Sequence, residues 1–266
     1  MVLKTLIFQL MLILPVIKNI AQNTNSDEWN GHQCAVVLTY DDGLNVHLDK
    51  VIPLLDSVDF KATFYVPGNA SALDNRLVEW AIASKTGHEL GNHTLNHPCA
   101  GKSMGRPWVN PDYDLDDYSA NKIIDEIKLA NTLLKAIDGK SQRTFAYTCG
   151  DTQIGGDSFI PEIKNSFVAA RSVGPSFEPL STIDLYQIGA FMVNGESGSE
   201  LISMVQQALD NKVLLVFLFH GVGGEHTINV SLEAHRQLIQ FLKDKQSEIW
   251  VAPLVEIAHY VNNNQK

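Results

Sequence analysis

The sequence predicts an α/β fold in which about seven to eight parallel strands form a barrel. Short apolar runs rich in β-branched and aromatic residues recur along the 266-residue chain, and segments with helical spacing separate most of them. This alternation is typical of a parallel sheet covered by helices. About eight such units fit a barrel better than an open sheet, although the pattern alone also allows the open form.

The elements follow one another in a regular order. The predicted strands lie at 35–39, 62–66, 88–93, 144–148, 167–171, 187–193, 213–219 and 249–254. The predicted helices lie at 47–58, 71–84, about 123–137, 199–211, 231–246 and 255–262. Ser71 is expected to cap the second helix and Gly139 to end the third. Residues 98–115 are rich in Gly and Pro and are expected to form a loop.

The N-terminus has the pattern of a signal peptide. Lys4 precedes an apolar run that is too short to span a bilayer, and Ala21 is a plausible cleavage position. We therefore expect a signal peptide at 1–21, a short linker at 22–33, one domain at 34–266, and a secreted or periplasmic protein without stable membrane insertion. The net charge of −10 argues against nucleic acid and anionic membranes as main partners.

Polar residues stand at the C-terminal ends of several predicted strands, where a parallel barrel places its chemistry. They are Asp41 and Asp42 in LTYDDG, His93 and His97 in HTLNH, Cys149 in CGD, Arg171 after FVAA and His220 after VFLF. Each has an ordinary structural explanation when taken alone. Their common position predicts one site at this face.

Two histidines and one carboxylate form a three-ligand set with an open position, which is the pattern of catalytic rather than structural zinc. One aspartate of the neighbouring pair can then bind a divalent cation, for which zinc is the first choice. The other aspartate can stay ionised beside the cation and act as a base. A cation thus explains why two carboxylates that repel each other follow the same strand.

The sequence resembles the polysaccharide deacetylase family, which is carbohydrate esterase family 4 and is also called the NodB homology domain. The resemblance covers roughly residues 34–262. TYDDG is similar to the family motif T-F-D-D-G, HTLNH to H-S/T-x-x-H, and FLFH to the last motif, a leucine or similar residue shortly before a histidine. The resemblance implies a distorted (β/α) barrel, a divalent metal that is often zinc, and removal of acetyl groups from sugars.

Carried over by motif, the resemblance implies a role for each strand-end side chain. Asp41 is implied as the catalytic base and His220 as the general acid. Asp42, His93 and His97 are implied as the metal ligands.

The third family motif, F-R-P-P-Y-G, corresponds to FAYTCG at 145–150. Cys149 takes the place of the tyrosine, whose backbone N–H helps to bind the oxyanion, and a backbone donor survives this change. Ala146 replaces the arginine that should orient the base, and the fourth motif, an acid followed by tryptophan, is not visible. We predict that Arg171, at the end of the next strand, pairs with the base instead. The alternative is a surface arginine paired with another acid.

The chain has three cysteines, which in an oxidising compartment allow one bridge and one leftover thiol. Cys99 lies two residues after His97, and Cys149 lies in the oxyanion turn, so both are expected near the metal. We predict a disulfide between them and a buried thiol at Cys34, the alternative being a reactive thiol at Cys149.

The predicted function is metal-dependent hydrolysis of O- or N-acetyl groups on an acetylated oligo- or polysaccharide. Trp108 and Tyr147 are predicted to contact this substrate, although Trp108 is equally compatible with capping the barrel rim. A sugar-binding pseudoenzyme is a second hypothesis, because the motif arginine is missing. An amidase acting on non-peptide C–N bonds is a third. The presence of the base, the three ligands and the acid favours the first.

Overall fold

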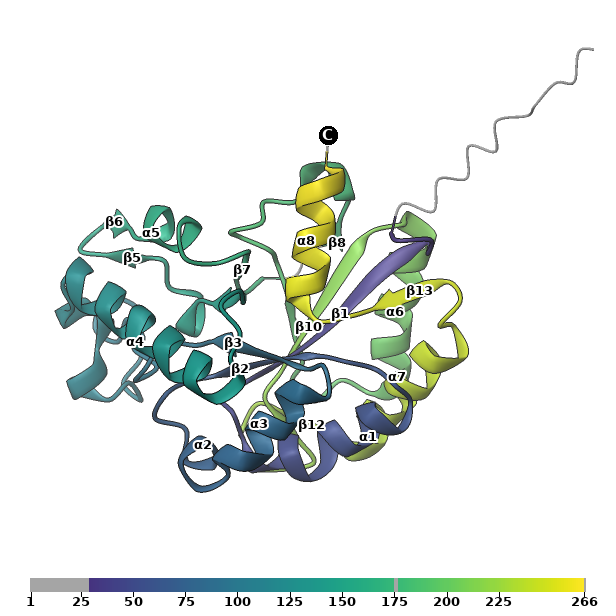
Figure 1. The fold of residues 1–266 in the computed structure, drawn as a ribbon, viewed down its shortest axis with the longest axis horizontal. Helices are drawn as coiled ribbons and strands as arrows, with labels where there is room; N and C mark the ends of the chain where they lie inside the picture. The colour runs from purple at the N-terminus through teal and green to yellow at the C-terminus, as the bar shows by residue number, and fades with distance from the viewer. Residues whose placement is uncertain (1–28, 175–176, 266) are drawn as a thin grey trace, which may run out of the picture.

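The computed structural model describes residues 29–174 and 177–265, and a curled sheet of nine strands forms its centre (Figure 1). The strands are β1 (Cys34–Asp41), β2 (Thr63–Val66), β3 (Glu89–Asn92), β4 (Phe145–Ala146), β7 (Ala170–Arg171), β8 (Phe177–Glu178), β9 (Phe191–Met192), β10 (Leu214–Phe219) and β13 (Ile249–Val251). Their order is β7-β4-β3-β2-β1-β10-β8, with β13 also paired to β1 and β9 to β10. The predicted α/β fold with a curled, mostly parallel sheet is confirmed; among these described strands, only β8 runs antiparallel to its neighbour.

β1 explains how the sheet positions a site. All eight residues of β1 are buried, and successive side chains point to opposite faces of the sheet, where they pack into two different hydrophobic cores. Val36, Leu38 and Tyr40 belong to the core between sheet and helices, whereas Ala35 and Val37 belong to the core inside the curl. Asp41 continues the inward-facing series at the C-terminal end of the strand. The strand pattern therefore aims this carboxylate at the mouth of the curled sheet.

The side that closes the curl is less regular than predicted. Of the expected strand 187–193, only Phe191–Met192 is a strand, and it pairs with β10. Just before it, Ile188 donates its N–H to the carbonyl of Ala170 at 3.1 Å, next to β7. The segment thus links β7 to β10 by a few bridges rather than by a continuous ladder, because its two ends pair with different strands.

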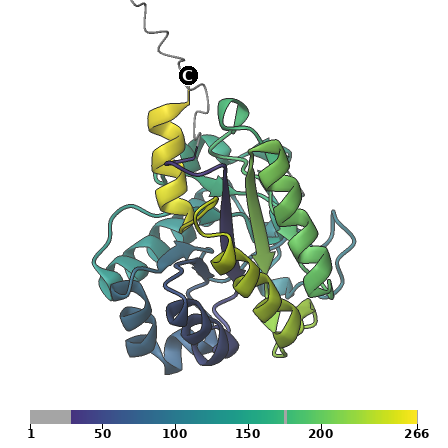
Figure 2. The same cartoon turned by 90° about the vertical axis from the view of Figure 1, so that its right-hand side faces the viewer.

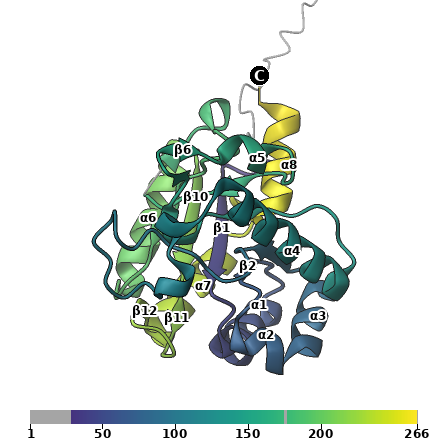
Figure 3. The same cartoon turned by 90° about the vertical axis from the view of Figure 1, so that its left-hand side faces the viewer.

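Most of the helices cover the outer face of the sheet, and the C-terminal helix packs against the inner core that contains Ala35 and Val37. The helices are η1 (His47–Val51) continuing into α1 (Ile52–Ser57), α2 (Ser71–Asn75), α3 (Leu77–Lys85), α4 (Ala120–Asp138), α5 (Ile160–Lys164), α6 (Gly198–Asn211), α7 (Leu232–Asp244) and α8 (Leu254–Asn264). Figure 2 shows α6 and α7 packed together, with α6 over β1 and β10, and Figure 3 shows α3 and α4 over the part of the same outer face that contains β3. Short 3-10 turns are η2 (Pro111–Tyr113), η3 (Leu115–Asp117), η4 (Thr148–Gly150) and η5 (Leu180–Thr182), and two small strand pairs are β5 (Gln153–Ile154) with β6 (Asp157–Ser158) and β11 (Gly221–Val222) with β12 (Asn229–Val230).

The helix ends follow the sequence with one exception. Gly139 ends α4 in the left-handed conformation with φ 73°, as expected for a glycine there. The predicted cap Ser71 is wrong, because Ser71 is the first residue of α2 and Ala70 precedes it without a side-chain cap. The predicted helix 71–84 is also broken at Arg76, whose φ of −132° and ψ of 33° are not helical.

The predicted signal peptide at 1–21 lies outside the described residues, as does most of the predicted linker. The part of the linker at 29–33 that is described packs against the domain. Trp29 is fully buried, and its Nε1 donates to the carbonyl of Lys212 at 3.0 Å. The folded region therefore includes Trp29. In the described part of the chain, no helix is both long and apolar enough to cross a bilayer.

Candidate metal centre and active-site cleft

A cleft of about 700 Å³ opens where β1, β3, β4 and β10 end. Its walls contain most of the side chains predicted from the sequence, together with several apolar residues. The lining residues are Asp41, Asp42, His93, His97, Arg106, Trp108, Tyr147, Cys149, Val173, Met192, Leu218, His220, His226, Thr227 and Ile228.

The turn after β1 presents both aspartates to this cleft. Asp42 has φ 75°, in the left-handed region that few non-glycine residues adopt. Gly43 follows with φ 58°, and a Cβ there would lie only 2.8 Å from Cγ1 of Val66. The glycine is thus required by conformation and by space. A regular strand would send consecutive side chains to opposite faces, whereas this turn lets Asp42 stay beside Asp41.

Asp42, His93 and His97 form a three-ligand group, with ligand atoms all within 4.8 Å of one another. Oδ1 of Asp42 lies 3.4 Å from Nε2 of His97 and 3.8 Å from Nε2 of His93. Nδ1 of His93 lies 2.9 Å from the carbonyl of Ala146, so it carries the proton and leaves the Nε2 lone pair free. Two imidazoles and one carboxylate fit a divalent metal with an open position.

Arg171 pairs with Asp41, as the sequence predicts. Its Nη2 donates to Oδ2 of Asp41 at 2.5 Å, and both side chains are buried. The contact uses one carboxylate oxygen rather than two, because Nη1 donates to the carbonyl of Ser172 at 3.3 Å. Oδ1 of Asp41 has no hydrogen-bond partner among the described residues. Burial raises the pKa of Asp41, but the charges of Arg171, His93 and His220 and the hydrogen bond from Arg171 together outweigh burial, so the net pKa lies below its ordinary value.

The strand register explains how Arg171 reaches the base. Arg171 on β7 is the direct partner of Ala146 on β4, so the two side chains leave the sheet on the same face. The guanidinium lies 5.0 Å from the centre of the Tyr65 ring, which belongs to the same inner core as Ala146. The small side chain of Ala146 leaves room for an arginine that comes from one strand further.

His220 lies on the other side of Asp42. Its Nε2 is 4.0 Å from Oδ2 of Asp42, and its ring lines the cleft. Nδ1 of His220 is buried without a hydrogen-bond partner among the described residues. Burial lowers the pKa of His220, and the nearby carboxylates Asp41 and Asp42 act in the opposite direction. No described residue therefore fixes a proton on Nδ1.

Comparisons with known proteins agree with this arrangement. Residues 30–155 match the family model described as polysaccharide deacetylase. This part of the chain is similar to the polysaccharide deacetylase family. A peptidoglycan-N-acetylglucosamine deacetylase from Bacillus cereus is 36% identical over 76 residues, which are 28% of this chain and 35% of that protein. The matched stretches span only 28% to 35% of the length of the curated relatives.

Solved structures share the fold. A Mycobacterium smegmatis protein, provisionally assigned as a polysaccharide deacetylase, has a TM-score of 0.64 at 14% identity, covering 88% of this chain and 92% of that one. A mutant of a protein described as a CE4 family pseudoenzyme has a TM-score of 0.52 at 16% identity, covering 84% and 67%. Because the same fold carries a pseudoenzyme, activity has to be argued from the site.

Two histidines in or near the cleft were not found by the sequence analysis. His47 is fully buried. Its Nδ1 accepts the N–H of Leu44 at 3.2 Å, so its Nε2 donates to the carbonyl of His220 at 2.8 Å. His226 stacks on His220, with ring centres 4.7 Å apart. The only sequence signal for His226 was its place in the glycine-rich stretch HGVGGEH, which follows β10 directly.

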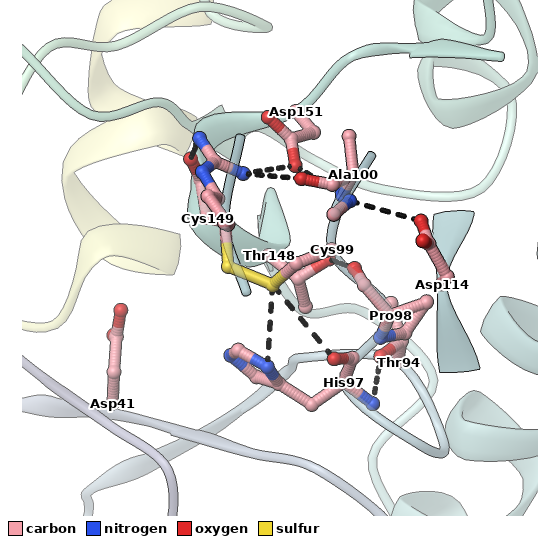
Figure 4. The surroundings of a disulfide bond; sticks show 12 residues. Asp41, Thr94, His97, Pro98, Cys99, Ala100, Asp114, Thr148, Cys149 and Asp151 are labelled. Carbon is pink, nitrogen blue, oxygen red and sulfur yellow. Dashed lines mark hydrogen bonds and ion pairs between the residues drawn. A yellow bond between two sulfur atoms is a disulfide. The ribbon is translucent and has the colours of Figure 1, made fainter. Parts of the chain in front are cut away.

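The predicted disulfide between Cys99 and Cys149 is present, with the two Cα atoms 5.8 Å apart (Figure 4). Because both sulfurs are bonded, Cys149 offers no reactive thiol. Sγ of Cys99 lies 3.7 Å from Nδ1 of His97, so the bridge packs directly beside the group formed by Asp42, His93 and His97. Cys34 is the free, buried thiol that the sequence predicts, and burial raises its pKa to about 12.

The two residues predicted to contact substrate differ in their placement. Trp108 lines the cleft and is 65% exposed, which suits a platform for a ligand. Its loop is fixed by Arg106, which donates to Asp151 at 2.6 Å. Tyr147 is almost fully buried, and its hydroxyl donates to the carbonyl of Tyr186 at 3.0 Å. The hydroxyl of Tyr147 is therefore used inside the protein, and the residue offers little surface for a substrate.

We predict that replacing Cys99 and Cys149 together by serine lowers the free energy of unfolding by about 3–4 kcal/mol, because the bridge closes a loop of about 50 residues in the unfolded chain. Urea unfolding of the double variant and of the wild type measures this difference. Cys34→Ala, which keeps the bridge, is the control. Thiol alkylation of the unfolded wild type without reductant should modify one cysteine per chain, and modification of three would contradict the prediction.

Proposed function

We propose that this chain is a metal-dependent hydrolase that removes acetyl groups from an acetylated carbohydrate. The observation that carries the proposal is a buried aspartate, held by Arg171, beside the three-ligand group in one cleft. A divalent cation, for which zinc is our first choice, would be held by Asp42, His93 and His97. When bound there, it supplies Lewis-acid activation of the acyl carbonyl and of the attacking water.

The protein residues then divide the proton transfers. Asp41 takes the proton of the attacking water on Oδ1, because Oδ2 already accepts from Arg171. The backbone N–H of Cys149, in the η4 turn that lines the cleft, donates to the developing oxyanion. His220 donates a proton from Nε2 to the departing sugar oxygen or nitrogen. A base that must be ionised and an acid that must be protonated give a bell-shaped pH profile.

A sugar-binding pseudoenzyme remains the second candidate. The missing motif arginine favoured it, and the contact of Arg171 with Asp41 removes that argument. The buried Nδ1 of His220 still favours it, because none of the described residues makes a hydrogen bond with this atom. An amidase acting on non-peptide C–N bonds would use the same groups. Secretion or periplasmic location stays a proposal that rests on the pattern of residues 1–21.

Acetate release separates these candidates. We expect the metal-loaded protein to release acetate from acetylated xylan or acetylated chito-oligosaccharides, and a chelator to abolish the release. Asp41→Asn should retain the metal and lower turnover by roughly 100-fold or more, because it removes the general base. Metal content is measured alongside acetate. Binding of these glycans without release would support the pseudoenzyme, and activity that survives complete metal removal would exclude the proposed chemistry.

Arg171→Ala should lower turnover and move the acidic limb of the pH profile upward. Arg171 lowers the pKa of Asp41, so without it the base becomes ionised only at higher pH. The double variant Ala146→Arg/Arg171→Ala should recover part of the turnover and part of the shift in the acidic limb. The reason is that residues 146 and 171 are direct partners in neighbouring strands and their side chains lie on the same face of the sheet.

Circular dichroism is used to check that Arg171→Ala is folded. This check is needed because removing one partner of a buried ion pair lowers the free energy of unfolding by about 3–5 kcal/mol. Arg236→Ala, which removes an exposed arginine on α7, is the matched control and should leave the pH profile in place. A folded Arg171→Ala variant with the wild-type rate and acidic limb would show that Arg171 does not tune the base.

A further inference from the structure

The loop that joins β11 to β12, two strands labelled in Figure 3, makes hydrogen bonds to the segment that follows Asp41 and Asp42. Oε1 of Glu225 accepts the backbone N–H of Asn45 at 3.0 Å and its side-chain Nδ2 at 2.8 Å. Oε2 accepts the N–H of Val46 at 2.6 Å. The Glu225 carboxylate thus satisfies backbone donors just before η1 and fixes the loop against the metal-centre turn.

A second set of contacts shapes the loop itself. Glu225 has φ 68°, in the left-handed region, directly before His226. Oδ1 of Asn229 accepts the N–H of Gly224 at 2.9 Å across the loop. Lys50 donates from Nζ to the carbonyl of Gly223 at 3.2 Å. These contacts fix the backbone around His226, and they therefore hold its ring in one position in the cleft wall.

The hydrogen bonds of His226 determine which nitrogen faces the cleft. Nδ1 of His226 lies 3.0 Å from the backbone N of Ile228 and 3.2 Å from the carbonyl of the same residue; the N–H makes the shorter contact, and a backbone N–H can only donate. We therefore assign the proton of the neutral ring to Nε2. Nε2 lies 3.7 Å from Oδ2 of Asp42, which is beyond hydrogen-bond distance. The side chain is 28% exposed, so this N–H donor is open to a ligand in the cleft.

His226 does not complete the metal centre. Among the described residues, the group of close ligand atoms contains Asp42, His93 and His97 but not His226. His226 faces the other oxygen of Asp42, Oδ2, on the same side as His220, whose ring stacks on it. In the proposed reaction, His220 serves the leaving group. A donor beside His220 therefore lies next to the sugar rather than next to the acyl carbonyl.

We propose that His226 is a specificity-determining residue, whose Nε2–H donates to the free hydroxyl next to the acetylated carbon of the sugar. This inference rests on the proposed function. Asp42 and His220 lie directly beside His226, and apolar residues such as Ile228, Val173 and Met192 make up other parts of the cleft lining. A donor held in a fixed position discriminates between ligands, because a ligand without the matching hydroxyl leaves the donor unpaired.

The test compares two pairs of probes. One pair is methyl N-acetyl-β-glucosaminide and its analogue in which the hydroxyl next to the acetylated carbon is replaced by hydrogen. The other pair is an O-acetylated methyl β-xyloside and the corresponding deoxy analogue. Affinity is measured by NMR titration of the metal-free and metal-loaded protein, and kcat/KM by acetate release. We expect the wild type to prefer the hydroxyl-bearing probe of at least one pair by roughly 10- to 100-fold.

Variants assign that preference to His226. His226→Phe should abolish it, and His226→Gln, which keeps an N–H donor, should restore part of it. Glu225→Ala should weaken it, because the loop loses its anchor. His259→Phe is the matched control, since His259 lies on α8 outside the cleft lining and its replacement should leave the preference intact. Far-UV circular dichroism and metal content accompany each variant.

The outcomes separate this inference from the proposed function. A preference in binding that His226→Phe abolishes supports the inference even if no acetate is released, in which case the proposed hydrolysis fails. Absence of any preference or of any binding in the wild type, or a preference that survives His226→Phe, overturns the inference. A loss of metal in His226→Phe also overturns it and makes His226 a ligand.

Discussion

The buried contact between Asp41 and Arg171 is the interaction on which the site depends. A single buried charge is costly, and each of these two charges is acceptable only because the other is present. The contact also joins β1 to β7 across the inside of the curled sheet. It therefore holds two strands that do not pair directly at a fixed separation. Because it occupies a single oxygen of Asp41, it fixes the carboxylate and still leaves Oδ1 available for a proton.

A series of buried polar groups, Glu89, Thr144 and Tyr65, packs against the Arg171 side of this contact. Glu89, as a carboxylate, accepts from the hydroxyl and the N–H of Thr144 at 2.8 Å and 2.6 Å. Thr144 has then used its only hydroxyl proton, so the hydroxyl of Tyr65 donates to it at 2.8 Å. The Tyr65 ring in turn lies beneath the guanidinium of Arg171. Each of these groups can donate or accept in only one direction, because its neighbour already uses the other. The contacts therefore fix the positions of Thr144, Tyr65 and Arg171 relative to one another.

The sequence predicted site residues that end or follow the strands and missed those in the loop that joins β11 to β12. Asp41 and Arg171 could be placed at one face because the ends of parallel strands converge, and Arg171 could be matched to the base by counting strands. His226 and Glu225 follow no period, since their positions depend on left-handed loop residues and long-range carboxylate contacts. The irregular closure near Ile188 was missed for a related reason: an apolar run predicts a strand but not which neighbours it pairs with.

The exchange between Ala146 and Arg171 shows what the chemistry constrains. The two positions are register partners on the same face of the sheet, so an arginine at both would bring two guanidinium groups to a single carboxylate. One positive charge would then be buried without a partner, which is strongly unfavourable. An arginine at one position therefore excludes an arginine at the other. What Asp41 requires is one fixed positive charge beside Oδ2, and either strand can provide it. The absence of the motif arginine is for this reason no sign of a defective site when the neighbouring strand ends in Arg171.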